Sequence, residues 1–396
     1  MLRPSSSIPR RGRGPLWRDP AVRALATQVI LLIALVAVIG LLIHNTLVNL
    51  EARGINTGFG FLDGRAGFPI SQTLIQYTSD STYGRTFAVG LLNTLLVSVL
   101  GIVAATLIGF LVGIARLSPN WLLARLAACY VELFRNIPLL LQILFWYFAV
   151  LRSLPSPRQS ISMFDAFFFN VRGMVMPAPE TQPAFVAVWV ALLVAIVATV
   201  GLVIYGRRRQ AATGRALPVG WIGTMLIIGL PIVAYFVTGR PLNWSVPELG
   251  GFNFRGGMHV LPELLALWLA LSIYTAAFIA EIVRSGIQSV PGGQTEAARS
   301  LSLPGGLTLR RIVLPQAMRV IIPQITSQYL NLTKNSSLAT AIGYPDLVAV
   351  FAGTTLNQTG QAIEIIAMTM AVYLIISLVI SLLMNIYNAR VALRER

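Results

Sequence analysis

Long apolar runs separated by polar stretches dominate the chain. Each run is about 20 residues long, the length at which an α-helix crosses the hydrocarbon core of a bilayer. The seventh run is the least apolar, because Gln324, Ser327 and Asn331 are among the polar residues that interrupt it. The pattern predicts an all-α integral membrane protein with about eight spans, at residues 24–43, 87–114, 128–150, 184–205, 218–238, 262–283, 320–343 and 362–387.

The composition supports this class. Of the 396 residues, 56% are hydrophobic and only 11% are charged, whereas soluble domains carry roughly 25% charged residues. The net charge of +16 would suit nucleic-acid binding only if the basic residues were clustered and interleaved with aromatic ones. They are instead scattered over several segments between the spans, so nucleic acid is excluded as a partner.

The arginine distribution predicts the orientation of the spans. Short loops rich in Arg and Lys stay in the cytoplasm, and by our count 20 of the 29 arginines fall on one side if the basic segment 1–23 is cytoplasmic. Eight spans then leave both termini in the cytoplasm. No A-x-A-like cleavage site follows the first span, which favours a retained anchor over a signal peptide.

The long segments 45–86, 151–183 and 239–261 are predicted to lie on the outer side. They carry turn formers and aromatic side chains. Aromatic side chains in such segments either lie in the membrane interface or form a docking platform. Within the second span, Gly109-x-x-x-Gly113 permits a close helix approach, although chance spacing in a glycine-rich helix explains it equally well.

The chain lacks the residues that nucleotide binding, metal binding and Cys/His catalysis require. A P-loop uses a lysine after a glycine-rich loop to reach nucleotide phosphates, and the only lysine, Lys334, follows Leu332-Thr333. The two histidines, His44 and His259, and the single Cys129 leave little for a metal site or a Cys/His pair. We therefore predict no catalytic and no metal-binding residue.

The stretch after the sixth span contains two short helical segments. Pro291 and two glycines break the spanning helix, and residues 295–301 favour a short helix. After a Pro-Gly-Gly turn, Thr308 is expected to cap a second short helix that Pro315 ends or kinks. Such a pair, lying at right angles to the spans, suits force transmission from a partner; the alternative is a loop that rests on lipid headgroups.

This stretch resembles the E-A-A-x3-G-x9-I-x-L-P loop of permease subunits of bacterial ABC importers. Glu296-Ala297-Ala298 and Ile312-Val313-Leu314-Pro315 match at the right spacing, and Ser302 stands where the family has glycine. If that position requires a left-handed backbone, a Cβ there costs about 1 to 2 kcal/mol.

Other stretches resemble the polar amino-acid uptake branch, and the layout is most similar to the Q-type permease of general L-amino-acid importers. Asn93-Thr94-Leu95, Glu132 to Leu140 with Gln142, and Lys334 to Leu338 carry this likeness. It implies a type I ABC importer transmembrane domain whose core is spans two, three, six, seven and eight. The implied division is 1–23 basic cytoplasmic tail, 24–86 anchor and periplasmic segment, 87–390 permease domain with a two-helix insertion at 151–260, and 391–396 cytoplasmic tail.

The resemblance also implies the function and the partners. The chain would be the pathway subunit of an importer of L-amino acids in the bacterial inner membrane, without enzymatic activity of its own. Its implied partners are an ATPase dimer that binds ATP and Mg, a second homologous permease, a periplasmic amino-acid-binding protein and membrane lipid; the chain itself would hold no cofactor. The alternative is a stand-alone ion-coupled carrier, although all 14 acidic residues fall in loops or near span ends. A membrane sensor or scaffold would leave the loop motif unexplained.

Two sets of site residues follow. A zwitterionic amino acid at mid-membrane needs hydrogen-bonding groups that face a cavity. Each polar candidate also has an alternative role, a hydrogen bond between two helices. Glu281 either meets a substrate ammonium group or pairs with Arg284 three residues later. The predicted coupling residues are Glu296, Ala297, Ala298, Ser302, Leu303 and Pro315, and the predicted pathway residues are Asn93, Thr94, Thr275, Glu281, Ser327 and Asn331.

Overall fold

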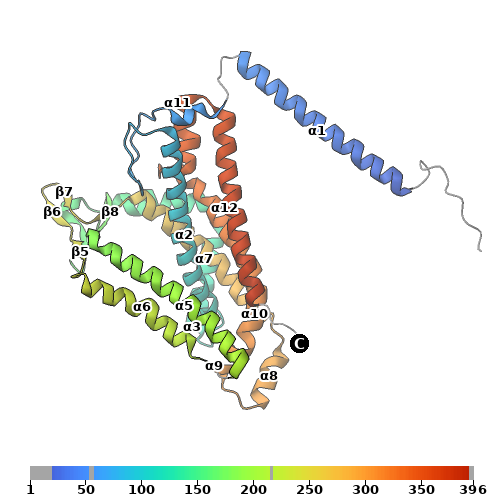
Figure 1. Cartoon of the computed structure of the whole chain (residues 1–396), viewed down its shortest axis with the longest axis vertical. Coiled ribbons are helices and arrows are strands. Elements are labelled where there is room, and N and C mark those ends of the chain that lie inside the picture. The colour runs from blue at the N-terminus through green and yellow to red at the C-terminus, as the bar shows by residue number, and fades with distance from the viewer. Residues whose placement is uncertain (1–19, 53–57, 215–216, 392–396) are drawn as a thin grey trace, which may run out of the picture.

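Six long apolar helices dominate the fold (Figure 1). The computed structural model describes residues 20–52, 58–214 and 217–391, so most of the basic tail and nearly all of segment 391–396 lie outside the described residues. Each of the six is long and apolar enough to cross a bilayer, which confirms the helical membrane fold. They are α1 (Pro20–Ala52), α2 (Tyr83–Ala115), α5 (Val186–Thr213), α6 (Val219–Val237), α7 (Pro262–Gln288) and α12 (Ala362–Val391).

The third predicted span is not a single straight helix. The chain forms α3 (Trp121–Asn136) and then α4 (Leu139–Leu144), which runs on through η3 (Phe145–Val150) and η4 (Leu151–Ser153). The two halves meet at 105°. The residue before a proline avoids the helical region, and Ile137, directly before Pro138, has an extended backbone (φ −96°, ψ 127°). Counted as one broken span, the pair brings the apolar spans to seven.

The seventh predicted span is amphipathic. Its residues form α10 (Leu314–Asn335) and the short η8 (Ser336–Ile342). The α10 helix is not among the apolar spans of the described chain, because only one of its faces is apolar. Ile321, Ile325 and Leu332 are buried on that face.

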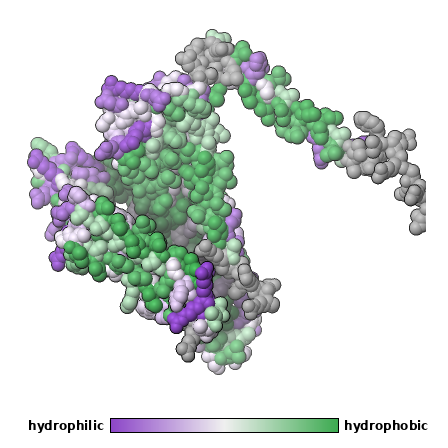
Figure 2. Space-filling model, in the orientation of Figure 1, coloured by the Kyte–Doolittle hydropathy of each residue, from purple (hydrophilic) through white to green (hydrophobic). Residues whose placement is uncertain are grey.

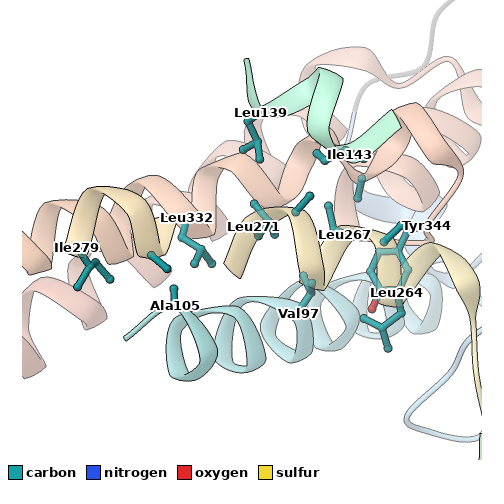
Figure 3. Close-up of a cluster of buried hydrophobic side chains, with 14 of the residues drawn as sticks. Val97, Ala105, Leu139, Ile143, Leu264, Leu267, Leu271, Ile279, Leu332 and Tyr344 are labelled. Carbon is teal, nitrogen blue, oxygen red and sulfur yellow. The ribbon is translucent and has the colours of Figure 1, made fainter. Parts of the chain in front are cut away.

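The core gathers around α7, which packs against α2, α3, α4 and α10. Figure 3 shows Leu267 and Leu271 of α7 beside Val97 of α2 and Leu332 of α10, with Ile143 of α4 close by. Complete burial of a leucine or valine stabilises a fold by about 1.5 to 3 kcal/mol when the exposed state is in water. Within a bilayer close packing takes over much of this role, since lipid is as apolar as leucine.

Two glycines set how closely α2 approaches α7. A Cβ on Gly109 would lie 2.6 Å from Cβ of Ile279, and one on Gly113 would lie 2.8 Å from Cβ of Val283. Real side chains do not approach so closely without displacement of the backbone. The Gly109-x-x-x-Gly113 spacing therefore serves close packing and is not a chance repeat.

Gly109→Val is expected to destabilise the protein by about 1 to 3 kcal/mol, the usual cost of overpacking a well-filled interior. Gly201→Val is the matched control, because a Cβ on Gly201 of α5 meets nothing within 4 Å. Thermal unfolding of the two purified variants, followed by size-exclusion chromatography, measures the difference. Equal melting temperatures would contradict the proposed role of Gly109.

Eight short strands depart from the expected all-α architecture. They join the segments 151–183 and 239–261, which are far apart in sequence, because β3 pairs with β8 and β4 pairs with β5. The aromatic run that includes Phe168 suits a strand, and the Phe168 ring lies 4.6 Å from that of Phe254. The sheets are β1 (Ile161–Met163), β2 (Phe167–Asn170), β3 (Gly173–Met176) and β8 (Met258–Val260) in the order β1-β2-β3-β8; β4 (Ala178–Thr181) with β5 (Leu242–Ser245); and β6 (Glu248–Gly250) with β7 (Asn253–Arg255).

The two extra helices predicted in the insertion are α5 and α6, which form a hairpin. Figure 2 shows apolar side chains over this hairpin and over the bundle side formed by α2 and α12, with polar side chains gathered around the strands. The strands lie where α5 begins, α6 ends and α7 begins, and we call this the strand end. The opposite end carries α8 (Gly292–Ser300) and α9 (Gly305–Thr308), and we call it the loop end. The remaining elements are η2 (Phe59–Asp63), η5 (Pro157–Gln159), η6 (Pro183–Phe185), η7 (Leu309–Val313), η9 (Val348–Thr355) and α11 (Leu356–Thr359).

Candidate functional site

The α8 helix forms the tip of the loop end. The α7 helix ends at Gln288, and Pro291 then takes an extended backbone directly before α8 begins. Glu296 and Ala297 are exposed, whereas Ala298 is only 1% exposed and packs inward. Of the three residues Glu296 to Ala298, the first two are thus available to a partner and the third fixes the helix to its own subunit.

A Schellman motif closes α8. The amide of Leu303 donates to the carbonyl of Ala298 (3.0 Å), and the amide of Ser302 donates to the carbonyl of Arg299 (2.8 Å). This motif requires a left-handed residue at the first position beyond the helix cap, usually glycine, and Ser302 has φ 56°. The glycine of the resembling motif therefore corresponds to the residue that ends α8, and Ser302 keeps the turn at the cost of strain.

Ser302→Gly is expected to stabilise this turn by about 1 to 2 kcal/mol, which corresponds to roughly 5- to 30-fold slower exchange of the Leu303 amide. Ser300→Gly, inside the last turn of α8, is the control and should have the opposite effect, since glycine weakens a helix by about 1 kcal/mol. Hydrogen exchange followed by mass spectrometry measures both. Unchanged exchange in Ser302→Gly would show that the left-handed backbone costs nothing here.

A recess of about 380 Å³ lies beneath α8. Leu303 and Thr308 line it from the loop, and Ile287 lines it from the end of α7. Of the predicted coupling residues, Leu303 thus faces this recess. Leu301, which was not among them, is 74% exposed at the tip. An apolar side chain in a polar turn is the sequence feature that could have identified it.

The second short helix predicted after α8 is not separate. The α9 helix begins after Pro304 and continues through the wider turn of η7 into α10, so residues 305–335 are helical without a break. Thr308 does not cap it, since its hydroxyl donates to the carbonyl of Pro304 (3.3 Å). Pro315 does not end the helix either. It lies in the first turn of α10 and directly follows η7, whose hydrogen bonds follow the wider π-helical pattern.

Glu281 of α7 lies between two arginines. Its carboxylate accepts hydrogen bonds from Arg284 on the same helix (Nη2 to Oε1, 2.5 Å) and from Arg116, the C-cap residue directly after the α2 helix. Arg284 also donates to Gln288 (2.6 Å). The side chains of Arg116 and Glu281 are 13% and 24% exposed. These contacts support the ion-pair alternative for Glu281 and add Arg116, which the sequence did not single out.

A polar recess of about 320 Å³ opens beside this cluster. Glu281 lines it together with Ser327 of α10, and Arg135 lies over the Phe278 ring at 5.2 Å. Ser327 and Asn331 are both exposed, on the side of α10 opposite the buried apolar face. We call this side the polar face of α10; it comprises Gln324, Ser327, Asn331 and Lys334, which follow one another at helical spacing.

Three predicted pathway residues lie in the interior of the subunit. Asn93 is fully buried, and its amide donates to the carbonyls of Gln72 (2.9 Å) and Pro345 (2.8 Å). Thr94 accepts from the amide of Leu347 (3.0 Å). These bonds attach α2 to the turn after η8, which supports the packing alternative for both residues. Thr275 is 3% exposed within α7.

Sequence comparisons place the chain among known transporter subunits. A family model described as binding-protein-dependent transport system inner membrane component matches residues 207–396. The putative amino-acid ABC transporter permease protein YhdX of Escherichia coli (strain K12) is 60% identical over 96% of this chain and 97% of its own length. The chain belongs to this family of ABC transporter permeases.

Two further relatives also match along nearly their full length. The general L-amino acid transport system permease protein AapQ of Rhizobium johnstonii is 52% identical over 98% of both chains. The glutamate/glutamine/aspartate/asparagine transport system permease protein BztB of Rhodobacter capsulatus is 44% identical over 96% of both. The permease is thus a multi-pass inner-membrane protein with the fold of a type I ABC importer subunit, and these relatives favour that reading over a stand-alone carrier.

Proposed function

We propose that this permease forms a translocation pathway for L-amino acids with a second, homologous permease, driven by an ATPase dimer that docks on α8. The observation that carries the proposal is the unbroken helical run 305–335. It begins in the loop that also holds α8, and it carries the polar face of α10. Movement of the loop is therefore transmitted directly to a helix that can line a pathway.

The polar face of α10 requires a cover other than lipid. Polar groups that face hydrocarbon are costly, and those in spanning helices face a bundle interior or a water-filled cavity. Ser327 and Asn331 are nevertheless exposed on the surface of this single subunit. A second permease that packs against this face would enclose it and create the pathway between the two chains.

The energy source is proposed to lie outside the chain. With Lys334 inside α10 and no glycine loop before it, the chain has no P-loop, so ATP and Mg would be bound by the partner ATPase. Glu296, Ala297 and Leu301 present a small, exposed surface at the tip of the loop end. Small side chains at its centre allow a partner groove to close around α8.

The proposed orientation places the loop end and both termini in the cytoplasm. The loop end then meets the ATPase, and the strand end meets the periplasmic binding protein. Glu296→Cys in a Cys129→Ser background tests this orientation, because a membrane-impermeant thiol reagent should label it in inverted membranes and not in intact cells. Labelling in intact cells would reverse the assignment.

The names of AapQ and BztB indicate the first substrates to test: L-glutamate, L-glutamine, L-aspartate and L-asparagine. The complex of this permease with the proposed second permease, ATPase and binding protein is expected to take up at least one of them in proteoliposomes. Uptake should require ATP on the ATPase side and the presence of the ATPase subunit. Uptake by the permease alone under an ion gradient would support the carrier alternative instead.

A further inference from the structure

The two helices of the α5–α6 hairpin pack mainly against each other. Only 11% of the most apolar stretch of α5 and 6% of that of α6 are buried, against 67% for α7, so lipid covers most of the hairpin. Close contacts join the pair: a Cβ on Gly206 of α5 would lie 2.7 Å from Cγ2 of Val219, and one on Gly223 of α6 would lie 2.7 Å from Cγ2 of Thr199. The first contact holds the loop end of α5 beside the start of α6.

The apolar part of α5 has the length of a membrane span. Residues 186–205 contain no charged residue, and at 1.5 Å per residue this stretch extends over about 30 Å, the thickness of the hydrocarbon core. Arg207, Arg208 and Arg209, which we call the arginine triplet, follow almost directly, and all three are exposed. The triplet therefore lies at the depth of the lipid headgroups. Trp221 is 77% exposed near the start of α6, and tryptophan favours the same depth.

The arginine triplet has no acidic partner within the hairpin. The sequence contains no acidic residue between Glu180 and Glu248. In the part of the chain that the structure describes, none of the ion pairs includes an arginine of the triplet. Three adjacent positive charges repel one another unless anions lie beside them. The anions that neutralise them therefore come from outside the described chain.

An anionic phospholipid supplies such an anion at the right depth. Guanidinium groups bind phosphate oxygens through two parallel hydrogen bonds, and the acyl chains of the same lipid pack on apolar helix surface. Figure 2 shows both features together, since hydrophilic residues lie at the loop end of the hairpin next to its apolar length. An acidic protein surface would match the charge but not the exposed apolar side chains beside it, such as Ile204 and Tyr205.

We propose that the arginine triplet and the apolar surface beside it form a binding site for anionic phospholipid, which anchors the loop end of the hairpin. The guanidinium groups bind the headgroup phosphates, and the uncovered sides of α5 and α6 bind the acyl chains. The general preference of arginine for cytoplasmic loops orients a span without requiring any bound lipid. Here the charges are adjacent and held in place by the Gly206 contact, so anionic lipid is enriched around them. This site is independent of the transported substrate and of the ATPase.

Quenching by spin-labelled lipids tests the proposal. Ile204→Cys in a Cys129→Ser background places a fluorophore at an exposed position beside the triplet. The whole chain is reconstituted in nanodiscs that contain the same small fraction of either phosphatidylglycerol or phosphatidylcholine, each spin-labelled near the start of an acyl chain. Phosphatidylglycerol is expected to be enriched about 5-fold or more around the fluorophore, which corresponds to the attraction of one arginine to an anionic surface.

A second position and two sets of variants assign the enrichment to the triplet. Val190→Cys in the same background lies toward the strand end of α5 and is exposed; the two lipids should quench it almost equally. Replacing all three arginines by glutamine is expected to remove the enrichment at residue 204. Replacing all three by lysine keeps the charges and should retain most of it.

A single substitution avoids any change in how the hairpin inserts. Arg208→Gln leaves two arginines of the triplet in place and should lower the enrichment at residue 204 to an intermediate value. Arg172→Gln, at an exposed position of the strand end, is the matched control for the loss of one positive charge. It should leave the enrichment unchanged.

Three results would overturn the proposal. The first is equal quenching by the two lipids at residue 204 when the triplet is intact. The second is an enrichment that persists in both Arg208→Gln and the triple glutamine variant. The third is loss of ATPase co-purification in Arg208→Gln without any lipid enrichment in the parent chain, which would assign the triplet to an acidic protein surface instead.

Discussion

Replacing Ala297 by arginine is expected to abolish ATP-driven uptake while the permease remains folded. Ala297 is exposed at the centre of α8 and makes no hydrogen bond through its side chain, so the permease loses no internal contact. If an ATPase groove closes around α8 as proposed, a long charged side chain there prevents that closure. Disrupting the centre of an interface costs about 2 kcal/mol or more, which corresponds to at least a roughly 30-fold loss of ATPase affinity.

The measurements are co-purification of the ATPase with the permease and uptake in proteoliposomes. Gln159→Arg adds the same charge at an exposed position of the strand end and should leave both unchanged. Leu301→Asp, which removes the exposed apolar side chain next to α8, should weaken co-purification as well. Normal co-purification and uptake in Ala297→Arg would show that the ATPase binds elsewhere.

Glu281→Gln is expected to have the second largest effect. The carboxylate joins the end of α2, through Arg116, to the end of α7, from which the chain enters the loop of α8. Breaking a buried ion pair by removing one partner costs about 3 to 5 kcal/mol; because these groups are partly exposed, we expect about 2 to 3 kcal/mol. Both the melting temperature and the rate of uptake should fall.

A double-mutant cycle separates the ion pair from a direct role in substrate binding. If Glu281 acts by pairing, the Arg116→Gln/Glu281→Gln double variant recovers part of the stability lost in Glu281→Gln, because no unpaired charge remains. If Glu281 contacts a substrate ammonium group, the uptake of L-glutamine falls in Glu281→Gln even where its melting temperature is normal. Identical stability and uptake in wild type and Glu281→Gln would contradict both roles.

The sequence predicted the helical segments well, because a bilayer imposes a simple length requirement on apolar runs. It failed where local backbone chemistry interrupts such a run. Pro138 lies within the third apolar run, and composition alone does not show that the chain turns by 105° there. The strands were missed because each is only three or four residues long. Two of the pairings, β3 with β8 and β4 with β5, also join segments more than 60 residues apart.

The loop that holds α8 was predicted in more detail than the polar residues of the spans. A left-handed backbone at Ser302 was considered as a condition, and the structure has it (φ 56°). A Schellman turn is a local structure, so its sequence requirements lie in neighbouring residues. Ala297 is exposed and Ala298 is buried, and this difference depends on how α8 packs against the other helices.

For the pathway, the sequence by itself determined which residues are polar within apolar runs, and the tertiary structure decided where they point. Asn93 and Thr94 turn inward and bond to a backbone segment about 250 residues away, whereas Ser327, Asn331 and Lys334 stay exposed along one face of α10. A polar group in a membrane helix must find a partner or water. Which of the two it finds depends on the neighbouring helices, and only the packing of distant segments decides that.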